Sequence, residues 1–254
     1  SSWHPRPFRR WFSRSEYRRE LLKYYLTHFA RQTFGKSMAK KSSAVLVQNA
    51  FVAQQLGSDG KTIVLSNQVV PPVASTAEVK IRPKVLGASG RLLPHKGLRL
   101  ILEVLGAPGM EEWTLEICGD NGIITELKDY ANRLGIASRV NWLGLKTHES
   151  HMEWLLTLDT YLFLSFREGA PWTLAELDTL GVRTVALDLP HTLPADSTDV
   201  VTSVSVEPSQ SLVSRLAETI RQSQVSSERP TSRLDFSTES YVSRLAAVFR
   251  QLRD

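Results

Sequence analysis

Beyond about residue 80, short apolar runs alternate regularly with helical patterns. The apolar runs predict strands at 84–89, 113–118, 139–143, 159–165 and 183–187. The stretches between and after them predict helices near 97–105, 122–134, 149–157, 172–180, 209–223 and 238–251. Strands and helices that alternate at this spacing are typical of a doubly wound, mostly parallel sheet. The sequence therefore predicts an α/β fold for this part of the chain.

The part of the chain before this alternation is shorter and differently patterned. A helix is predicted over 14–40, because one face of it carries apolar residues at i, i+3, i+4 and i+7, namely Leu22, Tyr25, Leu26 and Phe29. Strands are predicted at 44–48 and 62–66, with a helix over 50–56 between them. The segment 69–76 has paired prolines and small residues, which favour a linker.

Composition argues against a membrane-spanning protein and against a disulfide scaffold. No uncharged apolar run approaches the roughly 18 residues that a spanning helix needs, and no charged-then-apolar leader pattern opens the chain. Cys118 is the single cysteine, so we expect no internal disulfide and a reducing compartment. A buried packing role is favoured for this thiol, since free cysteines are commonly buried.

A Gly/Pro turn at 166–176 follows the apolar run at 160–165. The run reads as a buried strand of a parallel sheet, so the turn lies at the carboxyl end of a strand, where open α/β sheets bind ligands. Pro171 suits the first position of the next helix. The amides of Trp172 and Thr173 would then point outward without partners, ready to hold an anion.

Two carboxylates flank this turn. Glu168 precedes the predicted anion site, and Glu176 follows it one helical turn later. Acids beside a helix N-terminus suit a ligand that carries both phosphates and hydroxyls. The competing interpretation is that both residues cap the helix or lie on its solvated face.

A loop with two cations, 90–97, follows the strand predicted at 84–89. The planar guanidinium of Arg91 and the flexible ammonium of Lys96 together suit a diphosphate. The loop lacks the G-x-x-x-x-G-K-[ST] pattern, and Gly87 and Gly90 supply only G-x-x-G, so it is neither a Walker A loop nor a dinucleotide fingerprint. Taken alone, the two cations are better explained as solvated loop charges, because surface cations are common.

Taken with the rest of the chain, these residues form an ordered series of motifs. The series is Gly90-Arg91-Leu92-x-x-x-Lys96-Gly97, Ile117-Cys118-Gly119-Asp120, Arg139-Val140-x-x-Leu143-Gly144, Asp159, Glu168-x7-Glu176 and Gly181-Val182-x-Thr184-Val185-Ala186. It closely resembles the C-terminal, donor-binding domain of the retaining GT-B glycosyltransferases of glycosyltransferase family 4. The resemblance covers 80–190 and extends more weakly to Asp235-Phe236-Ser237.

The resemblance implies three parts of the chain. They are a remnant of an acceptor-side domain with a basic amphipathic helix (1–72), a linker (73–80) and a Rossmann-like donor-binding domain with C-terminal helices (81–254). A complete first domain of this kind has roughly 150 residues. We therefore expect a fragment of a longer enzyme, which would bind the donor without transferring a sugar.

The resemblance also implies an activity. Enzymes similar to this one transfer a sugar from a nucleotide-sugar donor to a glycan or lipid-linked acceptor with retention of anomeric configuration, and they need no metal. We expect a UDP- or GDP-linked donor and a role in surface polysaccharide or glycolipid synthesis. The alternative is a non-catalytic nucleotide-sugar-binding module that keeps only the donor half. Another doubly wound nucleotide enzyme, such as an epimerase, is disfavoured by the missing G-x-G-x-x-G.

Roles for individual residues follow from the same resemblance. Arg91 and Lys96 would bind the diphosphate and stabilise the departing nucleoside diphosphate. Glu176 would accept hydrogen bonds from the ribose hydroxyls, and Glu168 would lie beside the donor sugar. The resemblance also implies further donor-binding residues, which would contact the sugar, the phosphates or the nucleobase. They are Gly90, Gly119, Leu145, Lys146, Gly169, Ala170, Trp172 and Thr173.

Some polar residues fit the resemblance poorly or have no role in it. The loop at 189–196 replaces the family's Gly-Gly turn and acidic residue. His148 and His151 lie one helical turn apart, and with no third ligand at a suitable spacing a solvated helix face is favoured over a metal site. For His95, a surface position and an approach to the donor both stay open.

Basic residues are concentrated at the start of the chain. The net charge is +5, but residues 1–41 hold eleven Lys and Arg against two Glu, so this segment carries +9 and the remainder −4. Its interleaved aromatics suit an anionic lipid surface. A helix packed on the first domain with a solvated basic face is equally favoured, and no nucleic acid partner is expected. We expect a cytoplasmic protein, peripheral at the inner face of the plasma membrane where this segment binds lipid.

Overall fold

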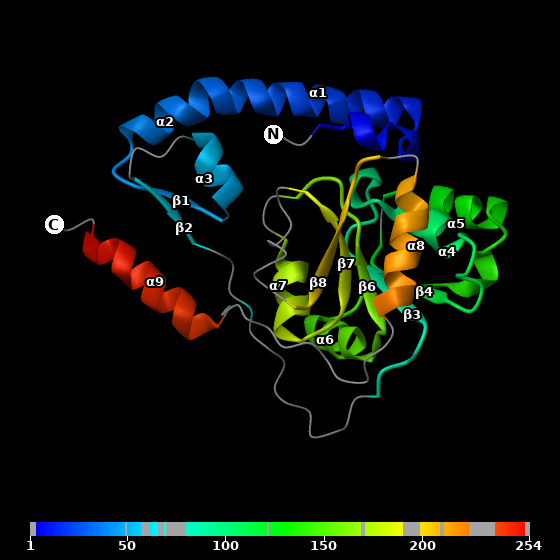
Figure 1. The fold of residues 1–254 in the computed structure, drawn as a ribbon. Coiled ribbons are helices and arrows are strands. Elements are labelled where there is room, and N and C mark those ends of the chain that lie inside the picture. The colour runs from blue at the N-terminus through cyan, green and yellow to red at the C-terminus, as the bar shows by residue number, and fades with distance from the viewer. Residues whose placement is uncertain are drawn as a thin grey trace.

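A six-stranded parallel sheet forms the centre of the computed structural model (Figure 1). The structure describes residues 4–48, 50–56, 61–65, 69, 80–120, 122–168, 171–189, 199–208, 211–223 and 237–251. In sheet order the strands are β5 (Val140–Gly144), β4 (Thr114–Cys118), β3 (Val85–Ser89), β6 (Thr160–Phe163), β7 (Thr184–Asp188) and β8 (Val201–Ser205). The predicted α/β class and parallel sheet are confirmed. The edge strand β8 was not predicted.

The strand order reverses between β3 and β6. From β3 the chain continues to β4 and β5 on one side of the sheet, and it then returns to β6, β7 and β8 on the other side. A crevice opens at such a switch point, beyond the carboxyl ends of the two central strands. The loops that start at Gly90 and Leu164 therefore meet at the place where this architecture binds ligands.

Helices cover both faces of the sheet (Figure 1). Buried side chains of α4 (Leu98–Leu105), α5 (Ile124–Arg133) and α8 (Leu212–Gln222) form one apolar cluster with residues of the sheet. Those of α6 (His148–Thr157) and α7 (Trp172–Thr179) form a second cluster on the opposite face. Every residue of β6 is buried between these layers, which is why this strand reads as a continuous apolar run.

A long N-terminal helix connects the large sheet to a smaller unit (Figure 1). It consists of α1 (Arg14–Ala30), a π-helical turn (Arg31–Gly35) and α2 (Lys36–Lys41), which confirms the helix predicted over 14–40. Ser13 and Glu16 form a capping box at its start. The small unit holds a parallel pair, β1 (Val45–Val47) and β2 (Thr62–Val64), with α3 (Ala50–Leu56). The last helix, α9, spans Thr238–Gln251.

Residues before α1 pack into the core of the large domain. The 3-10 turn Arg6–Trp11 buries Phe8 and Trp11, and these rings join the cluster that contains Leu86 of β3. Ion pairs reinforce the contact, because Arg99 of α4 lies 2.7 Å from Glu16 and Arg10 lies 2.6 Å from Glu103. Part of the segment 1–72 thus belongs in space to the same core as the donor-binding domain predicted at 81–254.

The apolar stripe on α1 is exposed. The exposed fractions are 60% for Leu22, 53% for Tyr25, 59% for Leu26 and 63% for Phe29. One of the two interpretations required this stripe to pack into a core. Among the described residues it does not. Within the described part of the chain, no helix has the length and apolar character needed to cross a membrane. The predicted linker (73–80) lies outside the described residues except for Lys80.

Candidate functional site

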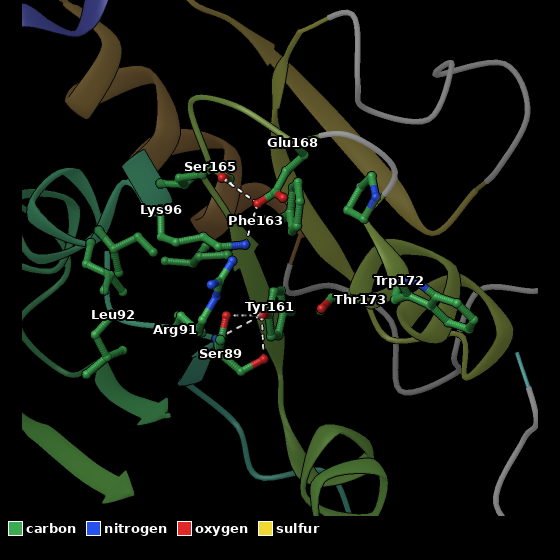
Figure 2. Close-up of a pocket in the computed structure, with 17 residues that line it drawn as sticks. Ser89, Arg91, Leu92, Lys96, Tyr161, Phe163, Ser165, Glu168, Trp172 and Thr173 are labelled. Carbon is green, nitrogen blue, oxygen red and sulfur yellow. Dashed lines mark hydrogen bonds and ion pairs between the residues drawn. The ribbon is translucent and has the colours of Figure 1, made fainter. Parts of the chain in front are cut away.

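Two adjoining pockets form one cleft at the carboxyl ends of β3 and β6. Figure 2 shows the first, with a volume of about 240 Å³. The second has a volume of about 360 Å³ and extends toward β4 and α6. The two pockets share five lining residues, which are Ser89, Gly90, Arg91, Trp172 and Thr173. The cleft therefore lies at the switch point of the sheet.

Two glycines let the loops of the cleft approach one another. Gly97 has φ +71° at the start of α4, and a Cβ there would collide with the backbone carbonyl of Leu164. Gly119 has φ +142° after β4, and a Cβ there would collide with the carbonyl of Gly90. Both positions are strained for any residue with a side chain. Glycine at these positions brings the loops after β3, β4 and β6 together.

Lys96 and Glu168 form an ion pair inside the first pocket. The distance from Lys96 Nζ to Glu168 Oε1 is 2.5 Å, and the Ser165 hydroxyl donates to the same oxygen at 2.7 Å (Figure 2). Only 22% of the Lys96 side chain and 14% of the Glu168 side chain are exposed. A backbone hydrogen bond of 2.7 Å from Phe166 to the His95 carbonyl holds the two loops in register. A phosphate bound here would compete with Glu168 for the ammonium group.

Arg91 and the start of α7 face the same cavity. Figure 2 shows the Arg91 side chain directed toward the ammonium of Lys96, with Thr173 across the cavity. Helix α7 begins at Trp172, so Pro171 is its N-cap with ψ 109° rather than its first helical residue as the sequence suggested. The amides of Trp172 and Thr173 still lie in the first turn, where a helix provides no acceptor of its own. Cations and a helix start thus converge on one space.

Glu176 lies one turn further along α7 and lines the second pocket. Its side chain is mostly buried, and burial raises the pKa of its carboxyl above the ordinary value. His148 opposes this rise from a distance of 3.9 Å between its Nδ1 and Glu176 Oε1. A carboxylate in this setting gains from hydroxyl groups that donate hydrogen bonds to it.

The structure brings together every predicted site residue that it describes. Members of the predicted set that line one pocket or both are Gly90, Arg91, Lys96, Gly119, Leu145, Lys146, Glu168, Trp172, Thr173 and Glu176. Gly169 and Ala170 lie outside the described residues, as does most of the loop at 189–196. The shared location supports a common site, while the individual roles stay predictions.

The two histidines on α6 differ in their surroundings. His148 matches the solvated face that the sequence favoured, with 57% of its side chain exposed. His151 does not, because its Nε2 lies 3.0 Å from Ser89 Oγ and its ring lines the second pocket. The helical periodicity of the sequence could have indicated that His151 is not on the solvated face, because it borders the buried face formed by Met152 and Leu155. Among the described residues, no group of acids, histidines and cysteines is arranged to hold a metal ion.

His95 does not line either of these two pockets. Burial, together with the nearby positive charge of Arg167, lowers the pKa of its imidazole to about 4. Its backbone carbonyl, rather than its ring, supports the loop that carries Glu168. His95 is therefore a partly buried loop residue outside both pockets, and the second interpretation, an approach to the donor, gains no support from them.

A comparison with protein families decides the identity of the chain. The family model described as glycosyl transferases group 1 matches residues 76–231. The chain belongs to the group 1 glycosyl transferases. The match spans the whole six-stranded sheet and the cleft, so the expected resemblance to glycosyltransferases is confirmed at the level of this family. A search of curated protein sequences gives no match.

Solved structures of glycosyltransferases share the fold. Apo lipopolysaccharide outer core galactosyltransferase WaaB is 20% identical with a TM-score of 0.61, over 83% of this chain and 62% of that one. Anabaena HepE in complex with UDP gives 18% and 0.64, over 85% and 66%. Pneumococcal O-GlcNAc transferase GtfA in complex with UDP and GlcNAc gives 15% and 0.65, over 87% and 47%. This group 1 chain thus spans about half to two thirds of these structures and shares the GT-B type of fold.

Proposed function

We propose that this protein binds a UDP- or GDP-sugar and serves a retaining, family 4 glycosyltransferase reaction. The observation that carries the proposal is the convergence of Arg91, Lys96 and the start of α7 in one cleft, with Glu168 and Glu176 beside it. This combination provides positive charge for a diphosphate and carboxylates for sugar and ribose hydroxyls. The acceptor would be a glycan or lipid-linked molecule of surface polysaccharide or glycolipid synthesis.

The cations of the cleft would act on the leaving group. When the bond between the sugar and the nucleoside diphosphate breaks, negative charge develops on the departing phosphate oxygens. Arg91, Lys96 and the amides that begin α7 are held in place to stabilise that charge. We propose that they take the part that a metal ion plays in other transferases. Glu168 would face the donor sugar, where it exchanges its contact with Lys96 for hydroxyl groups.

Nucleotide binding and sugar transfer are separable measurements. Calorimetric titration with UDP, GDP and ADP tests the donor site, and UDP comes first because the HepE and GtfA structures were obtained with UDP. Incubation with a panel of nucleotide sugars, followed by detection of released nucleoside diphosphate, tests transfer. Binding without release would favour the alternative of a non-catalytic nucleotide-sugar-binding module. Absence of binding to all three nucleotides would refute both.

Replacement of either cation should weaken nucleotide binding. We expect Arg91→Ala or Lys96→Ala to cost about 1.5–3 kcal/mol of UDP binding free energy, because each removes a charge-assisted hydrogen bond to the diphosphate. Isothermal titration calorimetry measures this loss. Arg133→Ala is the matched control, since Arg133 is an exposed cation on α5 that lines neither pocket. Unchanged titration curves for both cleft variants would show that the diphosphate binds elsewhere.

We also propose that the exposed stripe on α1 contacts an anionic membrane surface. Its apolar side chains lie among the cations of the +9 segment, and each cation near anionic headgroups contributes about 1 kcal/mol. The protein should co-sediment with phosphatidylcholine vesicles that contain phosphatidylserine, and less so as salt increases. Leu26→Glu combined with Phe29→Glu should abolish this binding. Binding that ignores both anionic lipid and salt would contradict the proposal.

A further inference from the structure

A chain of hydrogen bonds links three side chains in the wall of the cleft. Tyr161 of β6 is buried, and its Oη lies 2.8 Å from Ser89 Oγ at the end of β3 (Figure 2). Ser89 Oγ in turn lies 3.0 Å from Nε2 of His151 on α6. This series of hydrogen bonds links the first pocket, which Tyr161 lines, to the second pocket, which His151 lines. The mechanism proposed above uses none of these three side chains.

The distances favour one direction for these hydrogen bonds. The backbone N–H of Ser89 donates to Tyr161 Oη at 2.8 Å, so this oxygen is already an acceptor. The hydroxyl hydrogen of Tyr161 has Ser89 Oγ at 2.8 Å as its nearer acceptor, compared with the Ser89 carbonyl at 3.4 Å. The Ser89 hydroxyl is then free to donate to His151 Nε2. An imidazole that accepts at Nε2 and is neutral carries its proton on Nδ1.

The surroundings of His151 favour this neutral ring. Burial lowers the pKa of its imidazole, and the nearby charges of His148 and Lys146 lower it further. The indole of Trp154 packs against the imidazole, with the two ring centroids 5.4 Å apart, and so restricts the movement of the His151 ring. Among the described residues, Nδ1 has no hydrogen-bond partner. The neutral ring thus has one N–H without a protein partner among these residues, and His151 and Glu176 line the same pocket.

We propose that His151 is a binding residue for the ribose of the donor, where it donates from Nδ1 to a hydroxyl oxygen. This inference rests on the proposed nucleotide-sugar function. A ribose hydroxyl is both donor and acceptor, so the Glu176 carboxylate accepts its hydrogen while the His151 N–H donates to its oxygen. A site that hydrogen-bonds a hydroxyl in both directions rejects an analogue without it. His151 would therefore contribute to selection of ribonucleotides.

Two substitutions of similar size distinguish the contribution of Nδ1 to UDP affinity from that of Nε2. The amide nitrogen of Asn can occupy the place of Nδ1, whereas that of Gln reaches the place of Nε2. We expect His151→Asn to keep UDP affinity within about twofold and His151→Gln to lower it about 3- to 10-fold, as for one lost hydrogen bond. Titration calorimetry with UDP, 2′-deoxy-UDP and 3′-deoxy-UDP measures these affinities. Glu153→Gln, on the exposed face of α6 and in neither pocket, is the matched control and should change none of them.

The deoxy forms identify the hydroxyl and exclude a general loss of structure. For one of the two deoxy forms, His151→Gln should change affinity by less than about twofold, because the contact is already missing. An equal loss for UDP and both deoxy forms would overturn the inference, as would unchanged UDP affinity in His151→Gln. Ser89→Ala, which releases the ring without removing it, should lower UDP affinity less than His151→Gln does. If the unaltered protein binds no nucleoside diphosphate, the proposed function itself fails and this inference fails with it.

Discussion

Replacing Phe166 with alanine is expected to lower the free energy of unfolding by about 3–5 kcal/mol, the usual cost of deleting a buried phenyl ring. Phe166 is 0% exposed and stacks on Phe8 with ring centroids 4.2 Å apart. The rings of Trp11 and Phe12 enclose it at centroid distances of 5.8 Å and 5.5 Å. The substitution would leave a cavity among three aromatic side chains that cannot collapse onto it without movement of the N-terminal segment.

Urea unfolding followed by circular dichroism measures this loss. Phe249→Ala is the matched control, since Phe249 on α9 is 60% exposed, and its replacement should change stability by less than about 0.5 kcal/mol. The Phe8→Ala variant should lose stability by a similar mechanism. Because the two rings touch, the double variant should lose less than the two single losses added together. Equal small effects at Phe166 and Phe249 would mean that the aromatic cluster does not form in solution.

The second large effect is a loss of stability in mild acid that depends on His95. Burial, reinforced by Arg167, lowers the pKa of His95 to about 4 in the folded protein, from about 6.5 when unfolded. Between these two values the unfolded chain binds a proton that the folded protein does not, so stability falls as pH falls. Over this window the shift corresponds to about 3 kcal/mol. Below pH 4 the contribution of His95 should level off.

Comparison with His95→Gln isolates this contribution. Carboxylates also destabilise the protein in acid, for example Glu116, whose pKa is lowered by hydrogen bonds from Arg82. These groups act equally in both proteins, so the difference between the two stability curves belongs to His95. Urea titrations from pH 7 to pH 4 should show the unaltered protein losing about 3 kcal/mol more than the variant. Parallel curves would place the His95 ring in solvent.

The cleft was predictable because its signals are local. The buried strand before Glu168, the turn around Pro171 and the cations after β3 each occupy a few consecutive residues, and parallel strands bring their carboxyl ends to one edge. Strand β8 was missed because its exposed Thr202 and Ser205 interrupt the apolar signal. As an edge strand it is held by backbone pairing with β7 and by the buried Val201 and Val204.

Contacts between distant parts of the sequence were not predictable. The hydrophobic character of Phe8 and Trp11 indicates burial somewhere, but it does not show that Phe166 is their partner. The position of the His151 ring on α6 depends on Ser89 at the end of β3, which lies 62 residues earlier in the sequence. Such pairings are decided by packing of the whole domain, and periodicity within one helix carries no information about them.

The packing of Phe8, Trp11 and Phe12 on Phe166 determines where the polypeptide can be cut without exposing the core. A cut at the predicted linker would separate Phe8, Trp11 and Phe12 from the domain that they complete. The C-terminal fragment would expose the apolar side chains around Phe166, close in sequence to Glu168, to water. It would also lose the ion pair between Glu20 and Arg167, whose charged atoms lie 3.3 Å apart. The smallest autonomous unit that keeps the cleft intact therefore has two non-contiguous segments, and the opening residues are as much a part of it as the sheet.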